Sequence, residues 1–273
     1  HIDSLNQPVY TFYPEWNQGN KKKITLRHIL THTSGLQNVR MATKEIYPSP
    51  DVVKLALSAE LEQEPGTQFS YNNKAVNLLA GIFEKASGKS MDQYLEQELF
   101  HPMGIKKYRW SKDDAGNPYA MSGLQLYAKD IAKFGRLVLN NGVWEGHQLV
   151  SSDYIEKMAG KNTDGEFGLL WRKLPESSTF SLTEEDLQRL KEKGVSEKYI
   201  QKLKPYLNTE IDGSNIQKVY IEIFGNPEVL QREFIDKGVK KIFSSEIGDI
   251  AGYYGDGYLG QYLIILPRTR IVI

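Results

Sequence analysis

The clearest pattern of apolar and polar positions lies in residues 74–88, "KAVNLLAGIFEKASG". Apolar side chains recur there every three or four residues, the spacing that places them on one face of an α-helix: Val76, Leu79, Ile82, Phe83 and Ala86. Gly88 follows them, and glycine often ends a helix because it adopts a left-handed backbone without strain. The pattern predicts an amphipathic helix that ends at Gly88.

Three other segments between about residues 40 and 160 have helical patterns. In residues 50–61, "PDVVKLALSAEL", a proline and an aspartate are helix-start signals. Ser90 and Gln93 resemble a capping box that begins a helix over residues 91–100. Residues 127–142 place an apolar group on one side and end at an Asn-Gly pair: Ile131, Phe134, Leu137 and Val138. Together these segments predict a helical subdomain with few strands.

From Leu174 to about Gly248 the pattern changes. Residues 181–207 are typical of two short helices joined at Gly194. Residues 215–225, "NIQKVYIEIFG", alternate and predict a strand with one face formed by Val219, Ile221 and Ile223. Residues 226–238 predict a helix with Asn226 as N-cap, Pro227 in the first turn and Gly238 as the stop. The last residues, 260–273, predict two strands around a Pro-Arg turn.

Composition limits the function classes. The 273 residues include 34 basic and 34 acidic side chains, so net charge gives no support for nucleic-acid binding. No apolar run approaches the length of a membrane span. The absence of cysteine excludes disulfides, a thiol nucleophile and a zinc–thiolate site. The length suits one large domain or two closely packed ones.

Two histidines in "RHILTHTSGL", His28 and His32, have the four-residue spacing that zinc hydrolases use on a helix. A metalloprotease helix of that type needs a glutamate directly after the first histidine, and Ile29 stands there instead. The other histidines, His1, His101 and His147, belong to no motif. We therefore predict no metal site and no cofactor, and we expect these two histidines to form local hydrogen bonds at a helix end.

Five segments, in order, resemble the serine β-lactamase-like hydrolases, the group of class C β-lactamases, D-alanyl-D-alanine carboxypeptidases and related esterases. They are "ITLRHILTHTSGL", the Tyr-x-Asn segment and long helix of residues 65–105, residues 121–151, "FGLLW" (167–171) and "GYLGQYLIILP" (257–267). The resemblance covers residues 1 to about 171 and 251–273. It implies an α/β (α+β) fold of the β-lactamase type, with an antiparallel sheet flanked by helices beside a helical subdomain.

This resemblance also implies a domain organisation. Residues 1–172 would be β-lactamase-like and mostly helical subdomain, and residues 249–273 would form active-site strands. Residues 173–248 match nothing in the family pattern, so we interpret them as an inserted mixed α/β segment. It would serve as a lid or specificity subdomain, or as a docking surface for a partner.

Catalytic roles follow from the resemblance for the tyrosine motif. Tyr71 would be the tyrosine whose oxygen helps to move the nucleophile's proton, and Asn73 would orient a lysine and the substrate amide. A phenol with a pKa of about 10 needs a cationic neighbour to act near neutral pH. An alternative from the residues alone is that "SYNN" is an ordinary helix-start turn, where asparagine is favoured.

The third family motif is Lys-Thr-Gly or a variant, and this chain departs from it. We align Gly255, Asp256 and Gly257, followed by Tyr258, as the strand that would bind the substrate carbonyl. Glycines suit a strand whose backbone must approach a substrate. Asp256 would repel a substrate carboxylate, which favours a neutral ester or amide. A plain hairpin turn is the alternative interpretation of Gly-Asp-Gly.

The Ser-x-x-Lys motif of the family nucleophile occurs nowhere in the 273 residues. We expect it upstream of residue 1, and the family's closing strand and terminal helix beyond residue 273. A missing segment or a partner chain would then complete the fold. Ser34 is a weak substitute, because no lysine stands at the required spacing.

The resemblance therefore predicts a metal-independent serine hydrolase. It would act through an acyl-enzyme on a small-molecule or peptide-like ester or amide, and this chain alone would be inactive. The alternatives are a non-catalytic β-lactamase-like binding protein and a partner-interaction protein. Resemblance alone favours a bacterial periplasmic or extracellular location.

Overall fold

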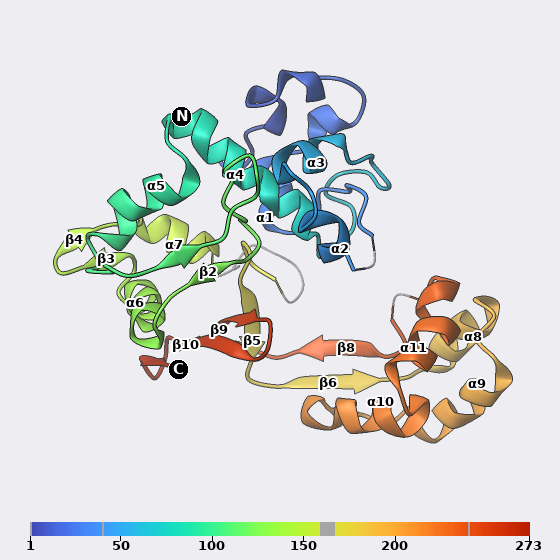
Figure 1. The fold of residues 1–273 in the computed structure, drawn as a ribbon. Coiled ribbons are helices and arrows are strands. Elements are labelled where there is room, and N and C mark those ends of the chain that lie inside the picture. Colours follow the sequence, from blue (N-terminus) through green and yellow to red (C-terminus); the bar gives the residue numbers. More distant parts are fainter. Residues whose placement is uncertain (1, 40, 159–166, 240) are drawn as a thin grey trace. The chain divides into compact units, whose positions relative to one another are not determined.

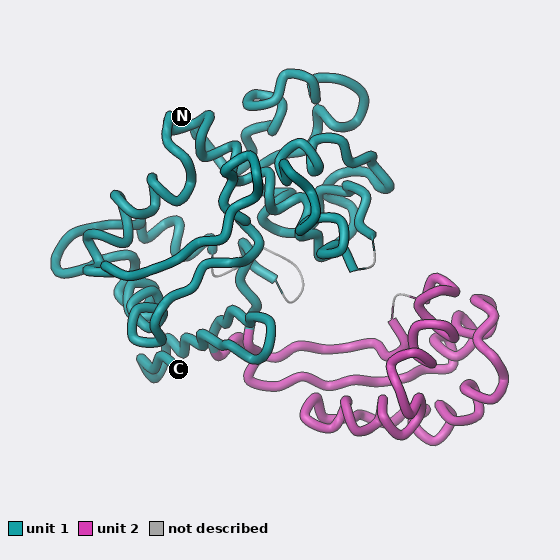
Figure 2. Tube along the Cα trace, in the orientation of Figure 1, with its two compact units in different colours: residues 1–173, 252–273 teal, residues 174–251 magenta. Residues whose placement is uncertain are grey.

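The computed structural model describes residues 2–39, 41–158, 167–239 and 241–273. The chain divides into two compact units, coloured separately in Figure 2. Unit 1 consists of residues 1–173 and 252–273, and unit 2 consists of residues 174–251. The chain leaves unit 1 within one strand and returns to it within another.

Before the chain enters its main sheet, the regular elements of unit 1 are mainly helices (Figure 1). Short 3₁₀ turns come first: η1 (Val9–Thr11), η2 (Pro14–Trp16) and η3 (Lys21–Lys23). The helices are α1 (Leu26–Leu30), α2 (Thr43–Ile46), α3 (Val52–Ser58), α4 (Asn73–Ser87), α5 (Met91–Leu95) with the π-helical turn η4 (Glu96–Phe100), α6 (Ala128–Leu139) and α7 (Ser152–Met158). Two small antiparallel ribbons pair β1 (Arg109–Trp110) with β2 (Leu124–Gln125), and β3 (Val143–Trp144) with β4 (His147–Gln148).

Helix α4 is central to the core of unit 1 and confirms the predicted amphipathic helix. The side chain of Asn72 caps its first turn by accepting a hydrogen bond from Ala75 N (3.0 Å). Gly88 ends it with a left-handed backbone, φ +73°. The buried face of α4 packs with η1, η2, α1 and α3 into one apolar cluster that includes Leu78 and Ile82. This packing fixes the position of the chain that enters α4.

The main sheet has the strand order β11-β10-β9-β5. Its strands are β5 (Arg172–Pro175), β9 (Ile250–Gly257), β10 (Gln261–Leu266) and β11 (Ile271–Val272), and β10 pairs antiparallel with both β9 and β11. The two terminal strands around a Pro-Arg turn are therefore confirmed. Helix α6 packs closely on this sheet, because a Cβ on Gly135 would lie 2.5 Å from Cγ1 of Val272.

Unit 2 has its own sheet and its own apolar core. Its sheet has the order β7-β6-β8, formed by β6 (Ser178–Ser181), β7 (Ile211–Asp212) and β8 (Ser244–Ile247). Its helices are α8 (Glu184–Glu192), α9 (Glu197–Leu203), α10 (Ile216–Phe224) and α11 (Pro227–Glu233), with turns η5 (Lys204–Tyr206), η6 (Gly213–Asn215) and η7 (Ile235–Lys237). The two predicted helices around Gly194 are α8 and α9.

The predicted strand at residues 215–225 is wrong, because the segment forms helix α10. Its alternation of β-branched residues coexists with a second pattern at positions i, i+3, i+4, i+7 and i+8: Ile216, Val219, Tyr220, Ile223 and Phe224. That pattern matches the helical period, and Val219, Ile223 and Phe224 are buried in the core of unit 2. Ile221, which a strand would place beside them, is 68% exposed. Tertiary packing overrides the β-propensity here.

Smaller differences concern the ends of helices. Ser90 is the N-cap residue of α5, but its side chain accepts no capping hydrogen bond, so the predicted capping box is absent. The helix predicted over residues 50–61 ends at Ser58. The helix predicted for residues 226–238 divides into α11 and η7, although Asn226 caps it as expected and Gly238 ends it with φ +73°. In the part of the chain that the structure describes, every helix is too short or too polar to cross a bilayer.

Candidate active site

Unit 1 contains a pocket of about 230 Å³ beside the start of α4. It is lined by residues from five segments: His32, Tyr71, Asn73, Val76, Ala120, Met121, Phe167, Leu170, Arg172, Tyr254, Gly255 and Asp256. Four of the six residues that the sequence predicts for the site, Tyr71, Asn73, Gly255 and Asp256, therefore lie in one pocket. The structure brings them together from two ends of the unit's sequence.

The start of α4 positions the tyrosine motif. Asn72 performs the capping, and its Nδ2 also donates to the carbonyl of Leu36 (2.9 Å). Tyr71 precedes the cap and is half-exposed at the pocket, whereas Asn73 is the first residue of the helix. The interpretation of "SYNN" as a helix-start turn is therefore correct for Asn72, which caps α4. Tyr71 and Asn73, on either side of Asn72, line the pocket.

His32 holds the tyrosine segment at three points. Its carbonyl accepts a hydrogen bond from Ser70 N (2.8 Å), and its Nδ1 accepts one from Asn72 N (3.1 Å). Its ring lies 4.4 Å from the ring of Tyr71, centroid to centroid. His32 is buried and has a left-handed backbone, φ 55°. Burial, together with the charge of Arg172, lowers the pKa of His32 to about 4, so the imidazole is neutral at pH 7.

The two histidines of "RHILTHTSGL" therefore have different tasks. His28 lies inside α1, where its Nδ1 accepts from Thr25 N (3.3 Å) in a capping box. That hydrogen bond is local, as expected. His32 lies beyond the end of α1 at Leu30, and its hydrogen bonds reach a segment about forty residues further along the chain. The backbone of His32 makes the expected local hydrogen bond, because its N donates to Ile29 O (3.2 Å), but its imidazole bonds to the distant segment instead.

Aromatic rings form one wall of the pocket. The ring of Phe167 lies 5.7 Å from His32 and 6.0 Å from Tyr71, centroid to centroid. The guanidinium carbon of Arg172 lies 4.5 Å from the centre of the same Phe167 ring, a distance typical of a cation–π contact. The segment that carries both residues is anchored to α1, because Leu170 N donates to Leu30 O (2.8 Å).

Gly255, Asp256 and Gly257 are strand residues. They lie in β9, opposite Leu263, Tyr262 and Gln261 of β10. The hairpin-turn interpretation is therefore wrong for these three residues, since the turn comes directly after them. Tyr258 lies in that turn and is 88% exposed, so its placement on the strand is also wrong. Neither Gly257 nor Tyr258 is among the residues that line the pocket.

Asp256 is paired, which changes the electrostatic argument made from the sequence. Its Oδ1 accepts a hydrogen bond from Nε of Arg172 at 2.6 Å, so the carboxylate and the guanidinium form an ion pair at the pocket. The expected repulsion of a substrate carboxylate assumed an unpaired acid and is correspondingly weakened. For Tyr71, burial raises the pKa, Arg172 lowers it and Asp256 raises it.

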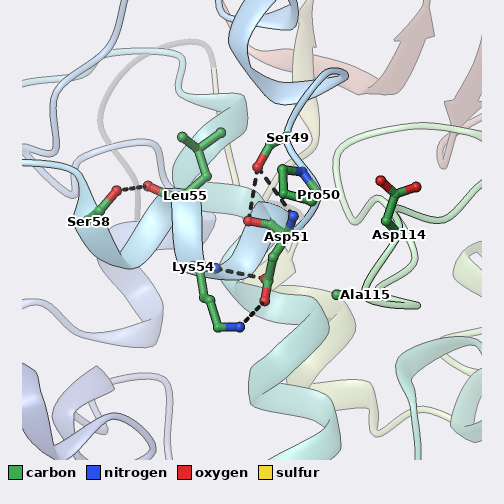
Figure 3. Close-up of a pocket in the computed structure, with 8 residues that line it drawn as sticks. All are labelled: Ser49, Pro50, Asp51, Lys54, Leu55, Ser58, Asp114 and Ala115. Atoms are coloured by element: carbon green, nitrogen blue, oxygen red, sulfur yellow. Dashed lines mark hydrogen bonds and ion pairs between the residues drawn. The ribbon is translucent and has the colours of Figure 1, made fainter.

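A second hollow, of about 570 Å³, lies around the start of α3 (Figure 3). Its polar groups maintain the local fold. Asp51 caps α3 through Lys54 N (2.9 Å) and pairs with Lys54 Nζ (3.0 Å). Ser58 Oγ donates to the carbonyl of Leu55 within the helix. This hollow is the larger of the two, but the motif residues line the smaller one.

Sequence reasoning assigned no site role to eight of the twelve residues that line the pocket, among them His32, Phe167 and Arg172. His32 stands in a quoted family segment, and Phe167 begins another, "FGLLW". Arg172 follows that segment directly, so its place beside a family strand was the available signal. Its ion pair with Asp256 joins positions 84 residues apart, and no local pattern predicts such a contact.

A helical subdomain, an antiparallel sheet, and a pocket that combines a Tyr-x-Asn segment with a glycine-bearing strand define a β-lactamase-like protein. The chain belongs to the Beta-lactamase family, whose family model matches residues 2–273. This match confirms the family and the fold class expected from the sequence.

Two curated relatives illustrate the match. The D-alanyl-D-alanine-carboxypeptidase/endopeptidase AmpH of Escherichia coli (strain K12) is 32% identical over 111 residues, which are 37% of this chain and 29% of AmpH. Penicillin-binding protein 4* of Bacillus subtilis (strain 168) is 33% identical over 94 residues, 32% of this chain and 21% of that protein. The chain thus spans less than a third of the length of these relatives.

Among solved structures, a Bacteroides dorei DSM 17855 protein assigned as a β-lactamase has a TM-score of 0.62 and 17% identity. The alignment covers 99% of this chain and 68% of that one. At this identity the likeness shows the fold alone. The interpretation of residues 173–248 as a segment inserted into the family fold stays a prediction.

Proposed function

We propose that this chain forms part of a metal-independent serine hydrolase, which cleaves an ester or amide bond through an acyl-enzyme. One observation carries the proposal: Tyr71 and Asn73 share a pocket with the strand residues Gly255 and Asp256. Acyl-transfer catalysis needs a proton-transfer group and a backbone that can bind the developing oxyanion, close to one reacting carbon. The pocket offers candidates for both.

In this proposal Tyr71 accepts the proton of the attacking serine and passes it to the leaving group. Burial raises the pKa of its phenol, so a positive charge nearby is needed for the phenolate to form near neutral pH. Asn73 orients the reacting groups through its side-chain amide. Because it begins α4, its backbone is fixed by the same cap that fixes Tyr71.

The strand contributes an open stretch of backbone at Gly255. A Cβ placed there would meet no atom within 4 Å, whereas a Cβ at Gly257 would lie 2.8 Å from the Gln261 side chain. Gly255 therefore leaves space for a substrate against the backbone, and we propose that the scissile carbonyl lies there. Five apolar side chains line the pocket and favour an uncharged acyl group: Val76, Ala120, Met121, Phe167 and Leu170.

The nucleophile in this proposal is the serine of a Ser-x-x-Lys segment outside these 273 residues. Ser34 does not replace it, because it is buried and is not among the residues that line the pocket, and its Oγ accepts a hydrogen bond from Leu36 N (3.4 Å). The resemblance places such enzymes in the bacterial periplasm or outside the cell, and this location stays a prediction.

Steady-state hydrolysis of a p-nitrophenyl ester and of the matching anilide by the full-length protein tests the proposal. Tyr71→Phe should lower kcat by about 10²- to 10⁴-fold, the range for loss of a general base. Tyr127→Phe is the matched control: this exposed tyrosine lies outside the pocket, so the rate should not change. A chelator should leave the rate unaltered. Full activity of Tyr71→Phe would contradict the proposal.

The alternative function is a non-catalytic protein that binds acyl ligands in the same pocket. The same variants separate it from the enzyme, because a binding protein would show no turnover while Tyr71→Phe weakened ligand binding. Partner binding through residues 174–251 that ignores Tyr71 would instead support an interaction protein.

A further inference from the structure

We propose that Arg172 is a positioning residue that supplies the positive charge beside Tyr71, in place of the lysine absent from the third motif. The inference rests on the proposed function for its catalytic meaning. Its structural basis is the arrangement of Arg172, Asp256 and Phe167 around the pocket. No resemblance assigns a role to Arg172.

Two contacts hold the guanidinium of Arg172 at the pocket. Nε donates to Asp256 Oδ1 at 2.6 Å, and the guanidinium carbon lies 4.5 Å from the centre of the Phe167 ring. Arg172 begins β5, which is the neighbour of β9 in the sheet, so the backbone brings the two charged residues together. A carboxylate and an aromatic face on either side of a planar guanidinium fix its orientation.

Tyr71 is placed so that the positive charge of Arg172 acts on its phenol. Tyr71 and Arg172 both line the pocket and both adjoin the Phe167 ring. The groups that face Tyr71 are His32, Arg172 and Asp256. His32 is neutral at pH 7 because its pKa is about 4, and so it adds no charge. Within the part of the chain that the structure describes, Arg172 is the one permanent cation among the pocket residues.

Asp256 then has a purpose that the sequence did not reveal. The Lys-Thr-Gly form of the third motif carries its own lysine, whereas here the corresponding stretch carries Asp256, which pairs with an arginine from the neighbouring strand. The acid opposes part of the effect of the arginine on Tyr71, since Arg172 lowers the pKa of the phenol and Asp256 raises it. Asp256 thus holds the guanidinium of Arg172 in place, and its negative charge cancels part of the effect of Arg172 on the pKa of Tyr71.

The titration of residue 71 in the 273-residue chain tests this inference without any need for turnover. A fluorinated tyrosine, which ionises at lower pH than tyrosine, is incorporated at position 71 and followed by ¹⁹F NMR across pH. Arg172→Met should move the titration midpoint upward, because removal of a nearby cation disfavours the phenolate. Arg172→Lys keeps a positive charge, so its titration midpoint should lie between those of Arg172→Met and the unaltered chain. Arg270→Met is the matched control, because Arg270 bonds to Leu139 and Asn140 outside the pocket.

Asp256→Asn provides a second test if Arg172→Met does not fold, because it removes the negative charge and leaves Arg172 in place. This variant should move the midpoint downward. An unchanged or lowered midpoint in folded Arg172→Met, or an unchanged or raised one in Asp256→Asn, would overturn the inference. A higher KM in Arg172→Met with no change of midpoint would assign Arg172 to substrate binding instead. Because the titration requires no catalysis, a protein that hydrolyses nothing could still give the expected shifts.

Discussion

Replacing His32 by asparagine tests how the tyrosine segment is held. His32 is buried as a neutral imidazole whose Nδ1 accepts from Asn72 N, and its pKa is lowered to about 4 from an ordinary value of 6.5. Asparagine can keep an acceptor near that position and tolerates the left-handed backbone that His32 adopts. It does not titrate. The substitution therefore removes the proton-linked part of the role of His32 and retains much of the rest.

The magnitude follows from the difference in pKa between the folded and unfolded states. Between pH 6.5 and 4 the unfolded chain binds a proton at residue 32 that the folded chain refuses, so acid lowers the free energy of unfolding. At about pH 4.5 the loss relative to neutral pH is about 2 to 3 kcal/mol. His32→Asn should lack this component. Its free energy of unfolding should therefore fall less on acidification than that of the unaltered chain.

Urea unfolding followed by tryptophan fluorescence is the assay, because it reports on unit 1 alone. All four tryptophans lie in that unit: Trp16, Trp110, Trp144 and Trp171. Carboxylates that lose stability in acid, such as Asp51 and Asp92, contribute equally to both proteins and cancel in the comparison. Equal losses for His32→Asn and the unaltered chain between neutral pH and pH 4.5 would refute the account of His32.

Three other predictions concern the start of α4 and the fold of unit 2. Asn72→Ala removes the cap of α4, so it should cost about 1 to 2 kcal/mol in urea unfolding and shift the titration of Tyr71; an unaltered free energy of unfolding would argue against the capping role. Ile223→Lys should unfold unit 2 and Ile221→Lys should not, because on α10 Ile223 is 1% exposed and Ile221 is 68% exposed. Hydrogen exchange of residues 184–203 measures this, and equal exchange in both variants would contradict the helical assignment of α10. Replacing residues 174–251 by a short linker should leave the fluorescence transition of unit 1 in place and alter substrate preference, and unchanged kinetics would exclude a lid.

Local patterns in the sequence predicted the elements whose first and last residues carry clear start and stop signals. Helix α4 has an asparagine-rich start and a glycine stop, and its apolar spacing fits a single period, so both of its boundaries were close to those observed. Segment α10 has two periods in one stretch, and the choice between them depends on the core of unit 2, which no local pattern contains. The strand was therefore the wrong choice for a physical reason.

The site was predictable where a motif is continuous and unpredictable where it is assembled from separate strands. Tyr71 and Asn73 stand in one segment with family spacing, and both line the pocket, while their catalytic roles stay a prediction. The ion pair between Arg172 and Asp256 depends on β5 lying next to β9, a topological fact. His32 was misread because its four-residue spacing from His28 resembles a helix, whereas α1 ends before it.

The central claim is that the full-length protein forms an acyl-enzyme type of adduct with the help of Tyr71. Intact mass spectrometry of that protein, before and after treatment with a fluorophosphonate, tests it most directly. The account predicts one added mass on a serine of a Ser-x-x-Lys segment outside residues 1–273, formed far more slowly in Tyr71→Phe and at the original rate in Tyr127→Phe. An unmodified protein, or an adduct that forms equally fast without Tyr71, would contradict it.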